Sequence, residues 1–523
     1  MSAIHDSAAK VELKGFFGHP RGLSTLFFTE MWERFSYYGM RAILFLYMTA
    51  AVANGGLGWD AAYAGPIFGL YASSVYFLPL IGGWIADRFI GAYRATFIGG
   101  VIIMLGHFSL AVPTIPFFYL GLVLVAVGTG FLKSNISAMV GDLYTAEDER
   151  RDAGFSIFYM GINIGALISP LVCGFLAQHP LFKSILGGWG IDPNSSWHFG
   201  FAAAGVGMAL GLVQYVIGKR HLEGVGAPPD HHEVDAEGNE FEDLSTAYLL
   251  QMLAVLVVAV VLIGGSAYLY GFDFALTYVL MPVVLVAGLI GVLLTGMQDR
   301  LSIDDWKRLV VIMVLFTFST LFWMGFEQAA TSLNLFAEKL TDTSIFGYHF
   351  PASWLQTVNP AFIIILAPVF AWLWVYLGKK QPTDAVKFSV GLLFAGLGFV
   401  VVGYAASLTD AGKVTFWWLV LVYLLHTIGE LCLSPVGLSS MTKLAPGRMV
   451  SLMLGVWFLS ISMGNYIAGR IAGEFEEKAS VLTGIFSKVA LILIIGAVVL
   501  FAISPLVKKL YLRDENEEPV EVN

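Results

Sequence analysis

The chain has 523 residues, of which 57% are hydrophobic and only 13% are charged, and its mean hydropathy is +0.75. Soluble proteins usually carry about a quarter charged residues. Because the deficit extends along the whole length, the composition indicates a membrane protein that crosses the bilayer many times. The formal net charge of −9 comes mainly from termini and loops, and no basic surface predicts a nucleic-acid partner.

Long apolar runs recur along the chain. A spanning helix needs about 20 mostly apolar residues, and by that rule the sequence holds fourteen such segments. They cover residues 23–53, 62–86, 95–112, 116–143, 152–176, 197–218, 246–269, 273–297, 306–338, 354–377, 385–407, 415–443, 449–474 and 482–509. The first run is too long for the apolar part of a cleaved signal peptide, so we expect it to remain as a spanning helix.

The charges of the connecting loops test this number of segments. If the N-terminus is cytoplasmic, nearly all loop Lys and Arg residues fall on the cytoplasmic side. The opposite side holds little more than Lys183, Lys339, Lys413 and Lys478. This asymmetry follows the positive-inside rule in every inside loop and predicts that both termini are cytoplasmic.

The longest polar interruption, residues 221–243, precedes two segments with almost no interior charge. The sequence therefore predicts an all-α membrane protein with an N-terminal six-helix bundle, a two-helix insert and a C-terminal six-helix bundle. The expected boundaries are 1–220 for the first bundle, 221–304 for the linker and insert, 305–511 for the second bundle and 512–523 for an acidic cytoplasmic tail. We expect the insert to face lipid. His221, His231 and His232 lie among acids in the linker, where we expect a solvated loop rather than a weak metal site.

The first segment contains the charged stretch TEMWERFSYYGM. On a helix, Glu30, Arg34, Tyr37 and Arg41 form one polar stripe, because they are spaced at i, i+4, i+7 and i+11. Glu33 lies on the flank of this stripe. A charge at the centre of a spanning helix costs roughly 2.5–3.5 kcal/mol on insertion scales. We therefore expect these four charges to face one another or a wet cavity.

Few other charges fall at membrane depth. Lys133 in the fourth segment offers a cation, and snorkelling to the interface is the alternative interpretation. Glu327 and Glu430 in the second bundle are carboxylates that could load and release protons or serve as latches. The first bundle is thus cationic and the second anionic inside, which suits a zwitterion. His426, one turn before Glu430, is either a packing residue or a proton-coupled group.

Aromatic and amide side chains complete the candidate site, and any single one is more often a packing residue than a ligand. As a set they could form aromatic walls and amide contacts for a peptide. They are Tyr37, Tyr38, Tyr71, Asn163, Trp323, Asn359 and Trp457.

These segments resemble the proton-dependent oligopeptide transporter family of the major facilitator superfamily. Residues 30–39 match the family signature ExxERFxYYG at every fixed position, and residues 158–167 (FYMGINIGAL) resemble its fifth-helix motif. Residues 82–94 (GGWIADRFIGAYR) look like the superfamily loop between helices two and three. Residues 326–328 (FEQ) and 429–438 (GEL…SPVGL) are similar to family segments in the second bundle. The resemblance covers essentially the whole chain, and the insert is typical of prokaryotic members.

The resemblance implies roles in proton coupling. Glu30, Glu33 and Arg34 would handle the proton, with Lys133 forming a salt bridge toward them. Glu327 is a further candidate for protonation. Which of the three carboxylates titrates stays open.

The resemblance also implies roles in binding and gating. Arg41 and Lys133 would hold the peptide carboxylate, and Glu430 would hold the amine. Arg41 with Glu327 would form the outer gate, and Lys133 with Glu430 would brace the inner side. Asn163 and Asn359 would bond the peptide termini and backbone, while Tyr37, Tyr38, Tyr71, Trp323 and Trp457 would shape the pocket.

One position departs from the family pattern. Mammalian-type members carry a proton-linked histidine in the second helix, where this chain has Gly69. Coupling would therefore rest on carboxylates or on His426. The complete ExxER set argues against the nitrate-type branch. We expect a proton-coupled symporter that imports di- and tripeptides by alternating access.

The alternatives are a same-fold transporter of another small anion or zwitterion, such as nitrate or a modified amino acid, and a non-transporting sensor. We expect no enzymatic activity, no cofactor beyond the proton gradient and no metal. The expected partners are peptides, protons and the lipid bilayer. The expected location is the cell inner membrane, with the protein monomeric.

Overall fold

The computed structural model describes residues 15–145, 148, 150–227, 246–271, 274–298, 301–446 and 449–511. The predicted acidic tail and most of the linker, with His231 and His232, lie outside the described residues. Within the described part, thirteen helical stretches are long and apolar enough to cross a membrane. Helix α1 (Arg21–Thr49) is not one of these thirteen stretches; it has 29 residues and carries several charged side chains. The predicted helical membrane fold is confirmed.

The chain forms two compact units. Unit 1 comprises the described residues of Met1–Phe241, Ala329–Ile365 and Gly412–Val420, and unit 2 comprises those of Glu242–Gln328, Leu366–Ala411 and Leu421–Asn523. The chain therefore passes between the units within the predicted second bundle. The domain boundaries expected from the sequence remain a prediction.

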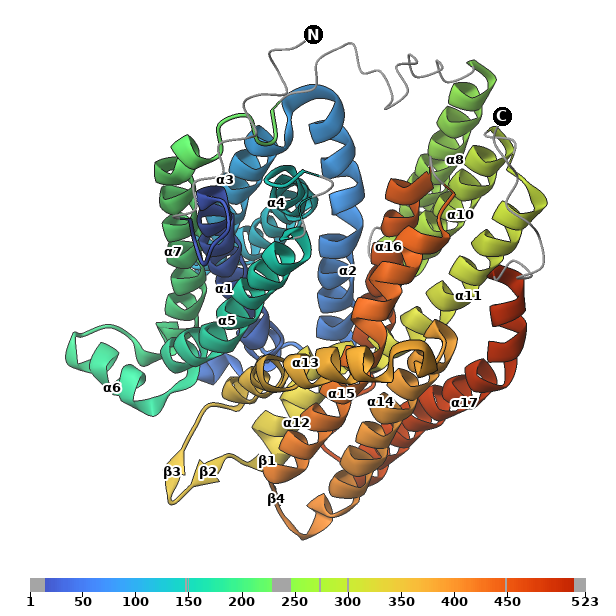
Figure 1. Ribbon diagram of the computed structural model, residues 1–523. Helices are drawn as coiled ribbons and strands as arrows, with labels where there is room; N and C mark the ends of the chain where they lie inside the picture. The colour runs from blue at the N-terminus through green and yellow to red at the C-terminus, as the bar shows by residue number, and fades with distance from the viewer. Residues whose placement is uncertain are drawn as a thin grey trace, which may run out of the picture. The chain divides into compact units, whose positions relative to one another are not determined.

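Unit 1 contains six long helices (Figure 1). They are α1, α2 (Ala61–Ile85), α3 (Ala92–Leu110), α4 (Ile115–Asp142), α5 (Arg151–Gln178) and α7 (Ser196–Ile217). Helix α1 packs against α5 and α7, and α3 packs against α4. Leu26, Leu132 and Tyr215 belong to the apolar core that joins these helices. Short helices η1 (Val52–Asn54), η2 (Ala86–Ile90), η3 (Pro193–Ser195) and η4 (Gly218–His221) connect them.

Two glycines allow α1 and α5 to approach closely. A Cβ on Gly165 would lie 2.3 Å from the carbonyl oxygen of Met31, and a Cβ on Gly39 would lie 2.5 Å from the Cys173 Sγ. Real Cβ atoms do not make contacts this short, so these positions require glycine. The signature of the first helix and the motif of the fifth are therefore packed directly against each other.

The remaining parts of unit 1 lie where the long helices end. Helix α6 (Pro180–Gly188) follows α5 and begins at Pro180, a residue suited to the first helical position. Helix α12 (Ser332–Leu340) and helix η7 (Ala352–Thr357) pack against each other and against α1, and η7 also packs against α5. Strand β1 (Thr341–Asp342) pairs with β4 (Val414–Thr415), and β2 (Ser344–Ile345) pairs with β3 (Tyr348–His349). The sequence did not predict α6 or these strands.

Unit 2 contains the insert and most of the later helices (Figure 1). The insert consists of α8 (Thr246–Tyr270), η5 (Ala275–Val279) and α10 (Leu280–Gln298). The bundle helices are α11 (Ile303–Phe326), α13 (Val358–Leu377), α14 (Asp384–Ser407), α15 (Trp417–Leu444), α16 (Val450–Ala472) and α17 (Ala479–Tyr511). Helices α13 and α15 each start in unit 1. Short helices η6 (Glu327–Ala330), η8 (Gly378–Lys380) and η9 (Thr409–Ala411) complete the order.

The segment predicted as one helix over 306–338 is interrupted. Helix α11 ends at Phe326, a 3-10 turn follows, and Thr331 has a non-helical backbone with φ −122° and ψ −100°. The Gln328 Nε2 donates to the carbonyl oxygens of Met324 at 3.4 Å and Ala468 at 3.2 Å. These bonds satisfy carbonyl groups near the interruption. Hydropathy alone could not locate the interruption.

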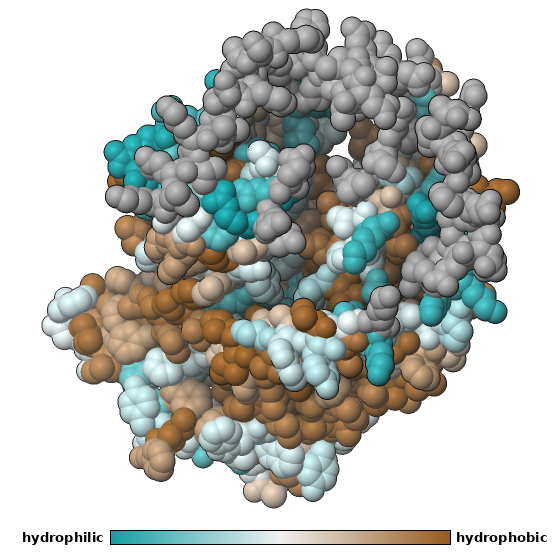
Figure 2. All heavy atoms as spheres, in the orientation of Figure 1, coloured by the Kyte–Doolittle hydropathy of each residue, from teal (hydrophilic) through white to brown (hydrophobic). Residues whose placement is uncertain are grey.

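The insert presents apolar side chains outward, as expected for a lipid-facing element. Leu250 is 60% exposed and Val261 is 63% exposed. Where the insert meets the bundle, the Arg470 guanidinium lies 4.2 Å from the Tyr278 ring centroid. Beyond the insert, Figure 2 shows hydrophobic residues over much of the lower part of the visible face.

Candidate functional site

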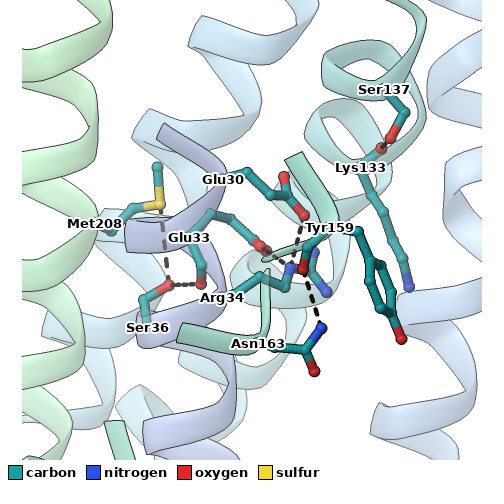
Figure 3. A network of polar contacts seen from close by, with 9 residues as sticks. All are labelled: Glu30, Glu33, Arg34, Ser36, Lys133, Ser137, Tyr159, Asn163 and Met208. Carbon is teal, nitrogen blue, oxygen red and sulfur yellow. Dashed lines mark hydrogen bonds and ion pairs between the residues drawn. The ribbon is translucent and has the colours of Figure 1, made fainter. Parts of the chain in front are cut away.

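The charged group of α1 is buried in unit 1. The exposed fraction is 3% for Glu30, 0% for Glu33 and 3% for Arg34. The Arg34 Nε lies 3.0 Å from the Glu30 Oε1 and also pairs with the Glu33 Oε2. Figure 3 shows both carboxylates directed at the one guanidinium. Since an isolated buried charge is costly, this mutual pairing explains how a spanning helix tolerates the charges of Glu30, Glu33 and Arg34.

Lys133 of α4 joins this charged group. Its ammonium lies 3.5 Å from the Tyr76 ring centroid and interacts electrostatically with Glu30. Figure 3 shows Lys133 on the same side of α1 as Arg34, whereas Ser36 faces Met208 on the other side. Two carboxylates and two cations make the group formally neutral. Protonation of either carboxylate would leave a net positive charge, able to hold an anion.

Arg41 lies two turns from Arg34 along α1 and is 8% exposed. Tyr71 of α2, which is 5% exposed, interacts electrostatically with Tyr37, Arg41, Glu33 and Arg34. The stripe expected from the sequence is thus assembled on one side of α1. Its two arginines, Arg34 and Arg41, have tyrosine neighbours.

Three further predicted residues also lie in unit 1. Asn163 of α5 is 5% exposed and donates from Nδ2 to the Tyr159 carbonyl oxygen at 3.0 Å. Figure 3 places Tyr159 and Asn163 on the same side of α1 as Lys133. The Tyr38 ring packs edge-on against Tyr37 at 5.2 Å. Asn359 lies in the first turn of α13, in the portion that belongs to unit 1.

The acidic candidates lie in unit 2. Glu327 is 3% exposed and occupies the residue at which α11 gives way to the 3-10 turn. Trp323, one turn earlier, is 7% exposed and packs against Phe326 at 5.3 Å. A Cβ on Gly464 would lie 2.4 Å from the Trp323 Cβ, so α16 approaches α11 closely here. The carboxylate thus sits at a break in a tightly packed helix.

Glu430 of α15 is half-buried in unit 2. His426 is 1% exposed, with ring contacts to Phe399 at 5.1 Å and Phe326 at 6.3 Å. His426 therefore contacts Phe326, the residue that precedes Glu327. The ring of Trp457, which is 3% exposed, packs against Phe388 at 6.2 Å. The two predicted gate pairs join residues of different units and remain predictions.

Sequence reasoning did not identify Tyr76, which contacts a predicted residue, or two hydrogen bonds that hold α12 in unit 1. Tyr76 holds the Lys133 ammonium, and a single sequence gives no sign of such a pairing. The Gln178 Nε2 donates to the Glu338 Oε2 at 3.1 Å, and the Asn334 Nδ2 donates to the Ala42 carbonyl oxygen at 2.8 Å. These bonds join α12 to α5 and α1 within unit 1.

The fold and the buried charges define a multi-pass membrane transporter. The family model described as the POT family matches residues 93–492. A peptide transporter of Yersinia enterocolitica, YePEPT, is 38% identical over 518 residues, covering 95% of this chain and 96% of that protein. A di-/tripeptide transporter of Lactococcus lactis is 37% identical over 513 residues, covering 95% of this chain and 97% of that protein. The chain belongs to the POT family.

Solved structures agree with this assignment. A crystal structure of the peptide transporter POT in complex with sulfate is 40% identical, with a TM-score of 0.82, covering 96% of this chain and 98% of that one. A POT family transporter in complex with 5-aminolevulinic acid is 35% identical, with a TM-score of 0.79, covering 95% of this chain and 99% of that one. The resemblance stated from the sequence motifs is confirmed.

Proposed function

We propose that the protein is a proton-coupled symporter that imports di- and tripeptides by alternating access. The observation that carries the proposal is the buried group of Glu30, Glu33, Arg34 and Lys133, in which each carboxylate has a cationic neighbour. Relatives described as peptide transporters support the choice of substrate.

In the proposed cycle, a proton taken up by Glu30, Glu33 or Glu327 frees a cation from its carboxylate. Arg41 and Lys133 then hold the peptide carboxylate, and Glu430 holds its amine. Rearrangement of the two six-helix bundles exposes the site to the other side, where the proton and peptide leave. At about 100 mV, each net positive charge moved inward contributes about 2.3 kcal/mol.

We further propose that the protein lies in the cell inner membrane with both termini cytoplasmic. It acts as a monomeric carrier rather than as an enzyme, driven by the proton gradient without a cofactor. The distribution of Lys and Arg in the loops supports this orientation.

The deciding experiment is dialanine uptake into proteoliposomes under an imposed inward proton gradient, with and without a protonophore. We expect accumulation that the protonophore abolishes. Uptake that is indifferent to the protonophore would contradict proton coupling. Absence of both uptake and counterflow exchange of dialanine would contradict the peptide substrate.

A second candidate function is transport of another small zwitterion or anion. Structural relatives in complex with 5-aminolevulinic acid and with sulfate support this second candidate. Competition separates the two functions. Excess dialanine should block uptake of labelled dialanine far better than 5-aminolevulinic acid or nitrate does, and the reverse order would support the second candidate.

A further inference from the structure

The end of α5 holds a chain segment that comes from much later in the sequence. Residues 329–365 join unit 1 between two stretches of unit 2. The Trp354 Nε1 donates to the Leu171 carbonyl oxygen at 3.1 Å, and Gln178 bonds to Glu338. His179, the residue that follows α5, forms a 2.6 Å hydrogen bond between its Nε2 and the Tyr348 hydroxyl. We call these contacts of α5 with residues 329–365 the clasp.

His179 is also the N-cap of the short helix α6. Its Nδ1 accepts a hydrogen bond from the Leu181 backbone N–H at 3.1 Å. A backbone N–H can only donate, so Nδ1 carries no proton and the neutral ring has its proton on Nε2. The Nε2–H therefore donates to the Tyr348 hydroxyl oxygen. The bond from the Leu181 N–H therefore requires a neutral imidazole.

Adding a proton to Nδ1 would set two N–H groups against each other. The cap of α6 would be lost, and a charged ring would lie among aromatic rings. His179 is 5% exposed, stacked on Trp354 at 6.2 Å and against Phe175 at 4.9 Å. A charged ring would keep its Nε2–H bond to Tyr348 but would be buried without an opposite charge, so protonation favours an opened clasp, in which water can reach the ring.

The other titratable and charged groups on the surrounding elements are Tyr348 and His349 on β3, Lys183 on α6, and Glu338 and Lys339 on α12. Glu338 bonds to Gln178 rather than to His179. No ion pair of His179 with these groups is found among the described residues, so none would compensate a charge on the ring.

We propose that His179 is a second proton-binding site, separate from the charged group of α1, and that its protonation releases residues 329–365 from α5. The inference rests on the proposed function for its orientation, because the predicted topology places His179 on the outer side. In that orientation an acidic exterior would protonate His179, and the protonation would open the clasp.

The direction of the pH dependence follows from the surroundings of the ring. Burial lowers the pKa of His179 below its usual value of 6.5. The clasp is therefore fully favoured above about pH 6.5 and weakens as pH falls toward the lowered pKa. One linked proton changes the open-to-clasped ratio by at most about tenfold per pH unit.

Hydrogen exchange of the full-length protein tests this proposal without requiring transport. We expect protection of the Leu181 and Tyr348 amides, corrected for intrinsic rates, to fall by up to about tenfold between pH 6.5 and 5.5. His179→Asn keeps a cap acceptor but cannot titrate in this range, so its protection should not depend on pH. His349→Gln, the matched control on the same strand, should behave like the wild type.

Equal pH dependence in the wild type and His179→Asn would overturn the proposal, as would loss of the dependence in His349→Gln. If His179→Asn does not fold, Tyr348→Phe serves instead, and its protection should be lower at every pH while still falling with acid. A Tyr348→Phe protein with wild-type protection would also overturn the proposal. Dialanine uptake is measured on the same samples. A pH-dependent clasp without uptake supports the proton site and contradicts only the peptide function.

Discussion

Glu33→Gln is the most informative substitution in the charged group of α1. The side chain keeps its size but loses its charge at a site that is 0% exposed. Removing the whole partner of a buried charge costs about 3–5 kcal/mol. Here Arg34 retains the Glu30 Oε1 at 3.0 Å, so we expect a loss of only about 1–3 kcal/mol in the free energy of unfolding. The variant should therefore fold.

Its transport should lose coupling while binding persists. A carrier that takes up one proton can accumulate substrate up to about tenfold for each pH unit of gradient, since one pH unit is worth 1.36 kcal/mol. For Glu33→Gln we expect dialanine to reach equal concentrations inside and outside, with counterflow exchange unchanged. The assay is labelled dialanine uptake into proteoliposomes under a gradient of one pH unit, beside counterflow without a gradient.

The matched control is Glu476→Gln, which removes an exposed carboxylate that pairs with Lys478 at 2.8 Å. It should accumulate dialanine as the wild type does. Continued accumulation by Glu33→Gln would refute a role of Glu33 in proton coupling. Glu30 would then be the candidate, and Glu30→Gln should lose coupling. Loss of both accumulation and counterflow in a folded Glu33→Gln protein would mean that Glu33 binds substrate.

Two further predictions concern other charges. Reversing either Arg41 or Glu327 alone should abolish dialanine counterflow, and the Arg41→Glu/Glu327→Arg double variant should recover part of it; a double variant no better than the single ones would remove this gate pair. Hydrogen bonds from Arg150 lower the pKa of Asp148 to about 2. Stability from this pair is present above about pH 3.8 and is lost only as pH falls toward 2. Arg150 contacts the Gly18 carbonyl oxygen at 3.2 Å, so the protection of amides near Gly18, corrected for intrinsic exchange rates, should not change between pH 5 and 4. Asp148→Asn should lower that protection at both pH values, and no change would contradict the role of the pair.

Hydropathy predicted the spanning helices because a bilayer imposes a minimum apolar length. The stripe of α1 was also predictable, since helical spacing alone brings Glu30 and Arg34 to one side. The interruption at Glu327 was not, because it depends on the Gln328 contact with Ala468, 140 residues away. The Tyr76 partner of Lys133 was missed for the same reason. Pro180 could have indicated the start of α6, since proline suits a first helical turn.

The distribution of the chain between the two units has a consequence for fragments. A cut in the linker after α7 would separate α1–α7 from residues 329–365, although the Asn334 and Trp354 side chains bond to the backbones of α1 and α5. The C-terminal half would then contain all of unit 2, whereas unit 1 would be divided between the two halves. Synthesised separately, each fragment would expose a surface that belongs against the other. Complementation should therefore require simultaneous expression, and mixing two purified halves should not reconstitute the protein.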